Sequence, residues 1–458
     1  MAPVSYSHEA APATRRRVGM ASGSNRRYNP TMAAKETFHH RRLACGIEFA
    51  AVPIDGRRTT TFYISFLAGM AHEPADRLGL THLVNETIDK GTEDRSGREL
   101  TDAFDAIGAQ QSSRAGREAF AFSCNCLPEY TDAALALCAE MLRRPTFPED
   151  SCGVAIDLAR QELVALEDEP DELVRRLMAR QAYGERLGRH ALGTRETLER
   201  IGREDIVAFW RTHFAASRMQ VAAGGAVDAD RFADALETHF AEFGSGALDG
   251  PDRFPVDFSP GRHHHEKTLE QEYILMGWPG VEITDEDYAI EEVMLGVLSG
   301  GMSSRLFTEV REKQGLVYWV GAWNEHPRGT GMLFMGASTM PARCDQTFDT
   351  LLREVDRLAE DITEEELARA KVGIVARRDT HGDTTSSRVA ELLQDLFHFR
   401  RPVPHREKIE RILAVKTADV RRYLEQHPRD RLSVVTLGTR ALGNADGESQ
   451  ENGVRGPK

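Results

Sequence analysis

A short run near residue 80 places an imidazole and a carboxylate at a spacing that allows joint chemistry. The run extends from Gly79 to Glu86 and reads Gly-Leu-Thr-His-Leu-Val-Asn-Glu. His82 and Glu86 are four positions apart, so a helix would place both side chains on one face. Imidazole nitrogen and carboxylate oxygen are both accepted ligands of zinc. The run therefore predicts a helix with part of a metal site on one face.

The same run departs at two positions from HxxEH, a signature of zinc peptidases. In that signature two histidines hold the metal, and the glutamate activates a water. His82 stands at the first histidine, Asn85 at the glutamate and Glu86 at the second histidine. A neutral amide cannot take the proton of the water, and loss of a general base costs ~10²–10⁴ in rate. The run therefore predicts a helix like that of a metallopeptidase but without the general base.

Two further segments carry polar side chains that could act beside this helix. Glu162 lies in a helical pattern, and by composition alone it is an ordinary solvated glutamate. Arg311 and Tyr318 are seven residues apart, at the end of a predicted helix and the start of a predicted strand. Their spacing alone also fits an exposed arginine and a packed aromatic side chain.

Three blocks of sequence together resemble the M16 peptidase family, subfamily B, which includes bacterial processing-type proteases and the mitochondrial processing peptidase. The blocks are GLTHLVNETIDKGT (79–92), ARQELVALEDEPDE (159–172) and GGMSSRLFTEVREKQGLVY (300–318). The resemblance implies an α+β protein with two tandem, homologous α/β-roll domains that form a clamshell around a peptide chamber. It also implies that Glu162 stands at the third zinc ligand, beside His82 and Glu86.

The resemblance assigns further roles outside the metal site. Arg311 is expected to grip the substrate, and the hydroxyl of Tyr318 is expected to stabilise the tetrahedral oxyanion. The stretch from Gly108 to Ser113 corresponds to an edge strand that captures an extended peptide through Gly108, Ala109, Gln110 and Gln111.

Composition limits the class of protein. The 458 residues are 41% hydrophobic and 28% charged, with a net charge of −14. This acidity argues against a nucleic-acid surface, and the sequence has no apolar run long enough for a membrane helix. The few cysteines are typical of a reducing compartment, so we expect a cytoplasmic location. An arginine-rich, acid-poor leader keeps open a mitochondrial location, with the leader as a transit peptide.

The order of predicted elements repeats, because strands followed by long amphipathic helices occur twice. From the N-terminus, the predicted parts are a disordered extension (1–35), an N-terminal domain (36–245), a linker (246–255), a C-terminal domain (256–440) and a disordered tail (441–458). The run His263-His264-His265 is expected to be solvated and to precede a strand. Gly300-Gly301 is expected to form a turn with Ser303 as a helix cap, although a glycine pair before a helix can also hold a phosphate.

Three hypotheses for function follow. In the first, the chain is the degenerate subunit of a heterodimer and supplies Arg311, Tyr318 and a peptide-binding surface to an M16B partner that carries HxxEH and the zinc. In the second, it is a self-sufficient metallopeptidase whose metal ligands are His82, Glu86 and Glu162. In the third, it is a structural protein without a role in peptide cleavage.

Overall fold

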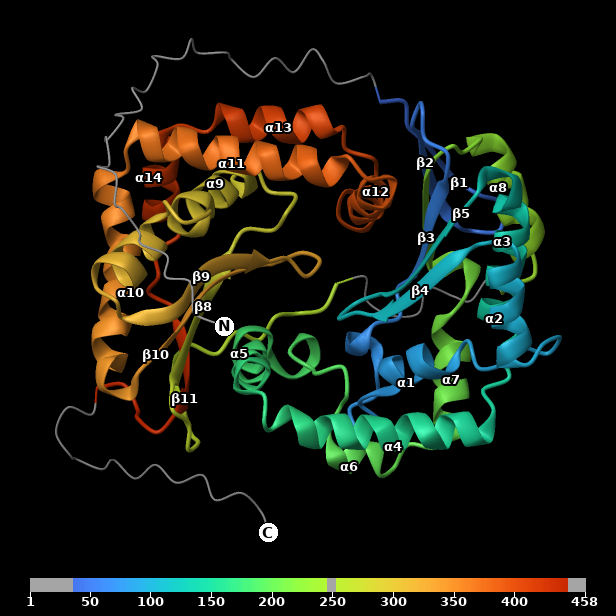
Figure 1. The fold of residues 1–458 in the computed structure, drawn as a ribbon, viewed down its shortest axis with the longest axis horizontal. Helices are drawn as coiled ribbons and strands as arrows, with labels where there is room; N and C mark the ends of the chain where they lie inside the picture. The colour runs from blue at the N-terminus through green and yellow to red at the C-terminus, as the bar shows by residue number, and fades with distance from the viewer. Residues whose placement is uncertain (1–35, 245–252, 444–458) are drawn as a thin grey trace, which may run out of the picture. The chain divides into compact units, whose positions relative to one another are not determined.

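The strands form two separate sheets, one in each half of the chain. The computed structural model describes residues 36–244 and 253–443. Within those ranges the first sheet has six strands in the order β1-β2-β6-β3-β5-β4, and the second has five in the order β7-β11-β8-β10-β9 (Figure 1). The predicted α+β architecture with two tandem domains is therefore confirmed. The predicted extension 1–35, most of the linker 246–255 and most of the tail 441–458 lie outside the described residues.

The bounds of the strands follow the chain order within each half. The first sheet contains β1 (His39–Arg42), β2 (Glu48–Pro53), β3 (Thr60–Phe66), β4 (Gln110–Ala115), β5 (Phe120–Cys126) and β6 (Met219–Gly225). The second contains β7 (Gly261–Glu266), β8 (Glu272–Gly280), β9 (Val317–Glu325), β10 (Gly331–Thr339) and β11 (Ser433–Gly438).

Helices surround both sheets. Those of the first half are α1 (Leu80–Thr87), α2 (Gly97–Ala106), α3 (Thr131–Arg143), α4 (Glu149–Leu166), α5 (Pro170–Leu187), α6 (Arg195–Leu198), α7 (Arg203–His213) and α8 (Ala229–Phe240). Those of the second are α9 (Tyr288–Ser299), the π-helix η5 (Phe307–Lys313), α10 (Cys344–Asp361), α11 (Glu364–Gly382), α12 (Thr385–Phe399), α13 (His405–Ala414) and α14 (Thr417–Gln426). Short 3₁₀ turns are η2 (Met70–His72), η3 (Pro128–Tyr130), η4 (Ala216–Arg218) and η6 (Pro341–Arg343). None of the described helices is both long and apolar enough to cross a bilayer.

Alternation along the strands decides which face of the first sheet is the core. Along β5 every second side chain is buried, beginning with Phe120 and Phe122. On β2, Phe49 stacks on Phe232 of α8 with ring centroids 5.5 Å apart. Aromatic pairs of this kind contribute about 0.5–1.5 kcal/mol beyond the area they bury. The polar alternate residues of β3 and β5 consequently face the opposite side of the sheet.

Each half lends one helix to the sheet of the other half. Helix α12 packs on β6, β3 and β2, where Val389 and Leu396 join a buried cluster with Val52 and Ala222. Helix α5 packs on β8 and β11 of the second sheet. Because each sheet buries apolar side chains against a helix from the other half, separating the halves would expose both surfaces to water.

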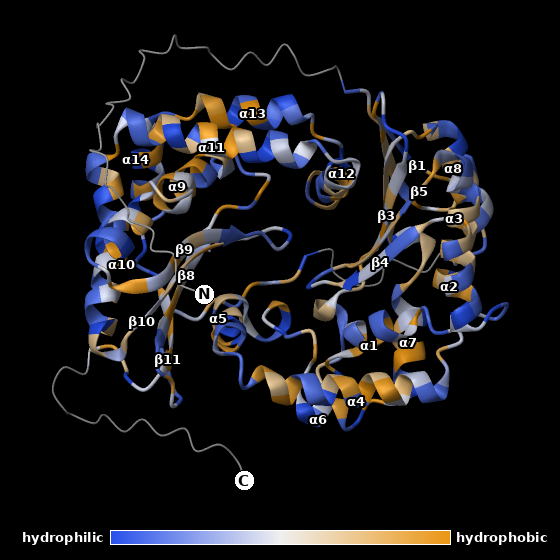
Figure 2. Ribbon diagram, viewed as in Figure 1, coloured by the Kyte–Doolittle hydropathy of each residue, from blue (hydrophilic) through white to orange (hydrophobic). Residues whose placement is uncertain are grey.

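Figure 2 shows apolar residues along α4, and several of them are not covered. Val154, Leu158 and Val164 are 59%, 51% and 71% exposed, whereas Cys152, Ala155, Ile156 and Ala159 on the other side of the helix are buried. An exposed apolar stripe on a helix is a common feature of surfaces that meet a partner.

Three local predictions were wrong. The histidines 263–265 lie inside β7, which pairs with β11 in parallel, and His264 Nδ1 lies 2.9 Å from Thr436 Oγ1. Long-range strand pairing here outweighs weak local preference. Gly108 and Ala109 precede the edge strand, which begins at Gln110. The helical turns after the glycine pair begin beyond Ser304, so Ser303 is not their cap.

Candidate functional site

A buried carboxylate fixes the start of α1, the helix that carries the altered motif. Gly79 precedes the helix in a left-handed conformation with φ 107°. The backbone N–H groups of Gly79 and Thr81 donate to the two carboxylate oxygens of Glu73 at 2.9 and 2.7 Å. Glu73 is only 2% exposed, and burial raises its pKa to about 7 even though these hydrogen bonds lower it. This carboxylate satisfies N–H groups that a helix start leaves without partners.

The three motif residues on α1 have different surroundings. His82 Nε2 lies 4.0 Å from Glu162 Oε2, so the structure brings together two of the three residues predicted as metal ligands. The amide of Asn85 donates from Nδ2 to Glu86 Oε1 at 2.9 Å. The group at the position predicted for the general base therefore binds the neighbouring carboxylate.

A zinc site of the predicted composition does not fit this arrangement. Throughout residues 36–244 and 253–443, no group of three histidine, cysteine, aspartate or glutamate side chains converges closely enough to hold a metal ion. Glu86 is an exposed residue whose carboxylate accepts a hydrogen bond from Asn85. Glu162 is 57% exposed in its side chain, so little holds it in a ligating position.

A second histidine lies beside His82 and was not found from the sequence. His190 follows α5, and its Nε2 lies 3.7 Å from Glu172 Oε1. Burial, with smaller contributions from the charges of Arg176 and His82, lowers the pKa of His190 to about 4. Its imidazole is therefore neutral near pH 7. No local pattern marks it, because Glu172 and Arg176 precede it by 18 and 14 residues and His82 lies in α1.

The predicted pair in the second half does come together. Arg311 lies in η5, and its guanidinium carbon is 5.7 Å from the ring centroid of Tyr318 and 5.0 Å from that of Phe307. Such contacts between a guanidinium and a ring are favourable by about 0.5–1 kcal/mol at exposed positions. Tyr318, at the start of β9, is 77% exposed. Its phenol is therefore accessible to another molecule.

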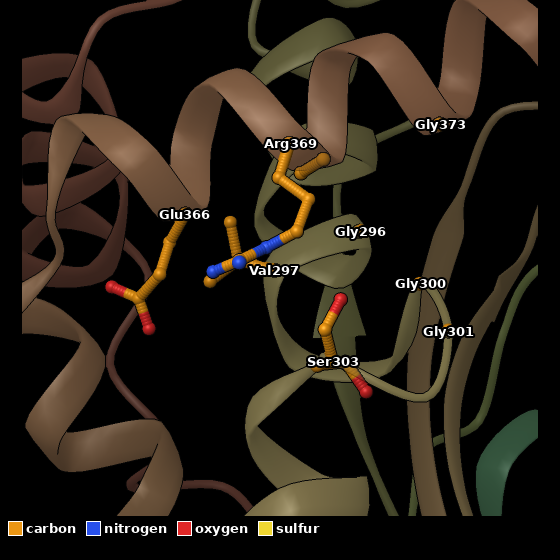
Figure 3. Close-up of a pocket in the computed structure, with 10 residues that line it drawn as sticks. Gly296, Val297, Gly300, Gly301, Ser303, Glu366, Arg369 and Gly373 are labelled. Carbon is orange, nitrogen blue, oxygen red and sulfur yellow. The ribbon is translucent and has the colours of Figure 1, made fainter. Parts of the chain in front are cut away.

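The glycine turn before this pair is a poor fit for a phosphate group. A small pocket of about 40 Å³ lies between Gly300-Gly301 and α11. Figure 3 shows that Glu366, Arg369 and Ser303 surround it. Hydrogen bonds, chiefly from Arg305, lower the pKa of Glu366 to about 2 although its burial opposes this, so its carboxylate is charged and would repel an anion. The predicted turn is therefore the better interpretation.

Strand β4 is an edge of the first sheet and borders a large cavity. It pairs with β5 on one side only, and α1 contacts it. A cavity of about 790 Å³ is lined by β3, β4, β5, the turn at 325–327 and α12. Of the residues predicted to bind peptide, Gln110 and Gln111 are in this strand. An edge strand with unpaired backbone groups can add an extended peptide as a further strand.

Two family models match consecutive parts of the chain. Residues 51–195 match the model described as insulinase (peptidase family M16), and residues 200–373 match the M16 peptidase inactive domain. The chain belongs to the M16 peptidase family.

Several relatives are similar over most of their length. An uncharacterized zinc protease of Rickettsia felis is 25% identical over 388 residues, which is 84% of this chain and 94% of that protein. One of Streptomyces coelicolor is 29% identical over 345 residues, covering 73% of this chain and 75% of that protein. A probable mitochondrial-processing peptidase subunit beta of Arabidopsis thaliana is 25% identical over 426 residues, covering 90% and 80% respectively.

Solved structures agree with the fold. An M16 inactive-domain protein of Pseudomonas fluorescens superimposes with a TM-score of 0.81 at 20% identity, covering 89% of this chain and 98% of that one. A protease of Helicobacter pylori has a TM-score of 0.77 at 16% identity, covering 88% and 99%.

Proposed function

We propose that this chain is the degenerate subunit of a heteromeric M16 peptidase. It binds peptide or unfolded polypeptide and supplies Arg311 and Tyr318 to an M16B partner that carries HxxEH and the zinc. The observation that carries the proposal is Asn85, whose amide occupies the position of the general base and donates to Glu86 at 2.9 Å. Because the amide is neutral and engaged as a donor, α1 has no group at this position to deprotonate a water.

The second half of the chain supports the proposal that this chain supplies Arg311 and Tyr318. Tyr318 is 77% exposed and carries a hydroxyl that can donate a hydrogen bond to a developing oxyanion. Arg311 lies beside it and can bind a substrate carbonyl. The similarity to proteins named zinc proteases, and to one named as a peptidase subunit, is consistent with a shared peptidase role.

A self-sufficient metallopeptidase is the second candidate, and one observation favours it. His82 and Glu162 face each other across α1 and α4 with 4.0 Å between Nε2 and Oε2. This candidate requires Glu86 to leave Asn85 and join them. It predicts stoichiometric metal in the purified chain and loss of cleavage in His82→Ala.

Mixing the chain with an M16B homologue that carries HxxEH tests the proposal. The chain alone is expected to cleave a quenched-fluorescence peptide no faster than background, and the partner alone only slowly. Titrating the chain into the partner should raise the rate until the two are equimolar. If the mixture is no faster than the partner alone, the proposal is wrong, and the structural-protein hypothesis becomes the better one.

A further inference from the structure

The face of β4 that borders the large cavity carries one cation. In the register of β4 with β5, Ser112 pairs with Ser123 and Arg114 pairs with Ala121. The hydroxyls of Ser112 and Ser123 are 2.8 Å apart, so these side chains share a face. Phe120 and Phe122 of β5 are buried on the opposite, core face. Arg114 therefore stands on the sheet face that is turned away from the core.

The acids that line this cavity already have partners. Glu118 accepts the backbone N–H of Arg328 at 3.0 Å, Glu325 accepts from Arg117 at 3.0 Å, and Glu391 accepts from Lys408 at 2.8 Å. His398, on the opposite wall, is neutral near pH 7 because burial lowers its pKa to about 4. Arg117 and Lys408 balance the charges of Glu325 and Glu391, and the charge of Arg328 acts on Glu118.

Arg114 differs from all of them. Its side chain is exposed, and it makes no hydrogen bond or ion pair with any of residues 36–244 and 253–443. The whole chain has a net charge of −14, so an exposed cation on this edge strand stands out against its surroundings.

We infer that Arg114 makes the peptide-binding edge selective for an acidic side chain. The inference rests on the proposed function, because it concerns the peptide that β4 is proposed to capture. A peptide strand added along β4 places every second side chain on the cavity face, and one of these lies directly opposite Arg114. Opposite charges in directly paired positions of neighbouring strands attract, and like charges repel. The preferred occupant is therefore an extended peptide with an aspartate or glutamate at that position.

The selectivity is local and moderate. Cross-strand charge pairs change affinity by about two- to fivefold, and added salt weakens such exposed pairs. The cavity has about 790 Å³ of space beside the strand, enough for the side chain of either acid. Backbone hydrogen bonds along β4 supply binding that does not depend on sequence.

Three fluorescein-labelled peptides test this inference with the full chain. Each has twelve Thr, Val and Ser residues except for one central residue, which is Asp, Asn or Lys, and the dissociation constants are measured by fluorescence anisotropy. The Asp peptide is expected to bind about two- to fivefold more tightly than the Asn peptide. Arg114→Gln should remove that difference, and Arg114→Glu should make the Lys peptide bind most tightly. Arg98→Gln, which removes an exposed arginine of α2 that pairs with Asp102, should leave the preference unchanged.

The outcomes distinguish a failure of this inference from a failure of the proposed peptide-binding function. If the three peptides bind equally well to the wild-type chain, or the Asp preference survives in Arg114→Gln, the inference is wrong and peptide binding stands. If none of the peptides binds, the proposed peptide-binding function fails and takes the inference with it. Circular dichroism of each variant shows that a changed preference does not come from unfolding.

Discussion

Helix α1 and the segment from η5 to β9 differ in how well their side chains suit peptide hydrolysis. Helix α1 has a well-fixed frame, because the 2% exposed Glu73 binds two of its first N–H groups. It nevertheless presents an amide where hydrolysis needs a base. The segment from η5 to β9 presents an exposed phenol beside an arginine, both of which suit transition-state stabilisation. The comparison shows that the positioning of a site and its chemistry can be separated within one chain.

The contrast between the two regions should disappear most clearly when α1 is given the glutamate and histidine of HxxEH. The double substitution Asn85→Glu with Glu86→His restores HxxEH on a helix whose His82 already faces Glu162. We expect about one zinc ion per chain and cleavage at least about a hundredfold above that of the wild-type chain alone, because a general base is worth ~10²–10⁴. Metal analysis and a peptide-cleavage assay measure both. Adding His82→Ala to the double variant should abolish the gain; a double variant without metal would show that more than two residues separate α1 from a zinc site.

Removing the hydroxyl of Tyr318 tests the other region, the segment from η5 to β9. In the assembled complex, Tyr318→Phe is expected to lower kcat about a hundredfold with little change in KM, since loss of one oxyanion donor costs ~10²–10³. Steady-state kinetics with a saturating amount of the variant chain measures the split. Tyr130→Phe, which alters a 39% exposed tyrosine elsewhere, is the matched control. Unchanged turnover in Tyr318→Phe would favour a purely structural role for this chain.

The smallest effect on catalysis is expected at Glu73, which holds the start of α1 and is tested through the stability of the chain. Burial raises the pKa of Glu73 from 4.5 to about 7, so between these values the folded chain binds a proton that the unfolded chain has lost. Stability contributed by this group is therefore full below pH 4.5 and falls as pH rises towards 7. In Glu73→Gln, which cannot titrate, that fall is absent. We expect the wild-type minus variant difference in unfolding free energy to shrink by about 3 kcal/mol across this range.

Urea unfolding at several values of pH between 4 and 8 measures this difference. Histidines with lowered pKa values, such as His190, affect both proteins equally and cancel in the subtraction. A difference that does not change with pH would mean that folding leaves the pKa of Glu73 unchanged.

Much of the fold was predictable because it depends on local patterns. The alternation of Phe120, Phe122 and Cys124 is visible in the sequence and indicates a strand, in agreement with the bounds of β5, Phe120–Cys126. The run His263-His264-His265 has no such pattern, and only its pairing with β11 makes it a strand. Helix α8 also has a local signal, because the side chain of Asp228 caps its start.

The sequence by itself determined the chemistry of α1, because the amide at Asn85 and the carboxylate at Glu86 are fixed by residue type. The sequence also determined that Arg311 and Tyr318 lie near each other, because only seven positions and one turn separate them along the chain. Only the tertiary structure decided that Glu73 caps α1, that α12 covers the sheet of the other half, and that Arg114 faces a cavity without a partner among the described residues. These features depend on which distant elements pack together, and that is settled by burial of apolar surface over the whole chain.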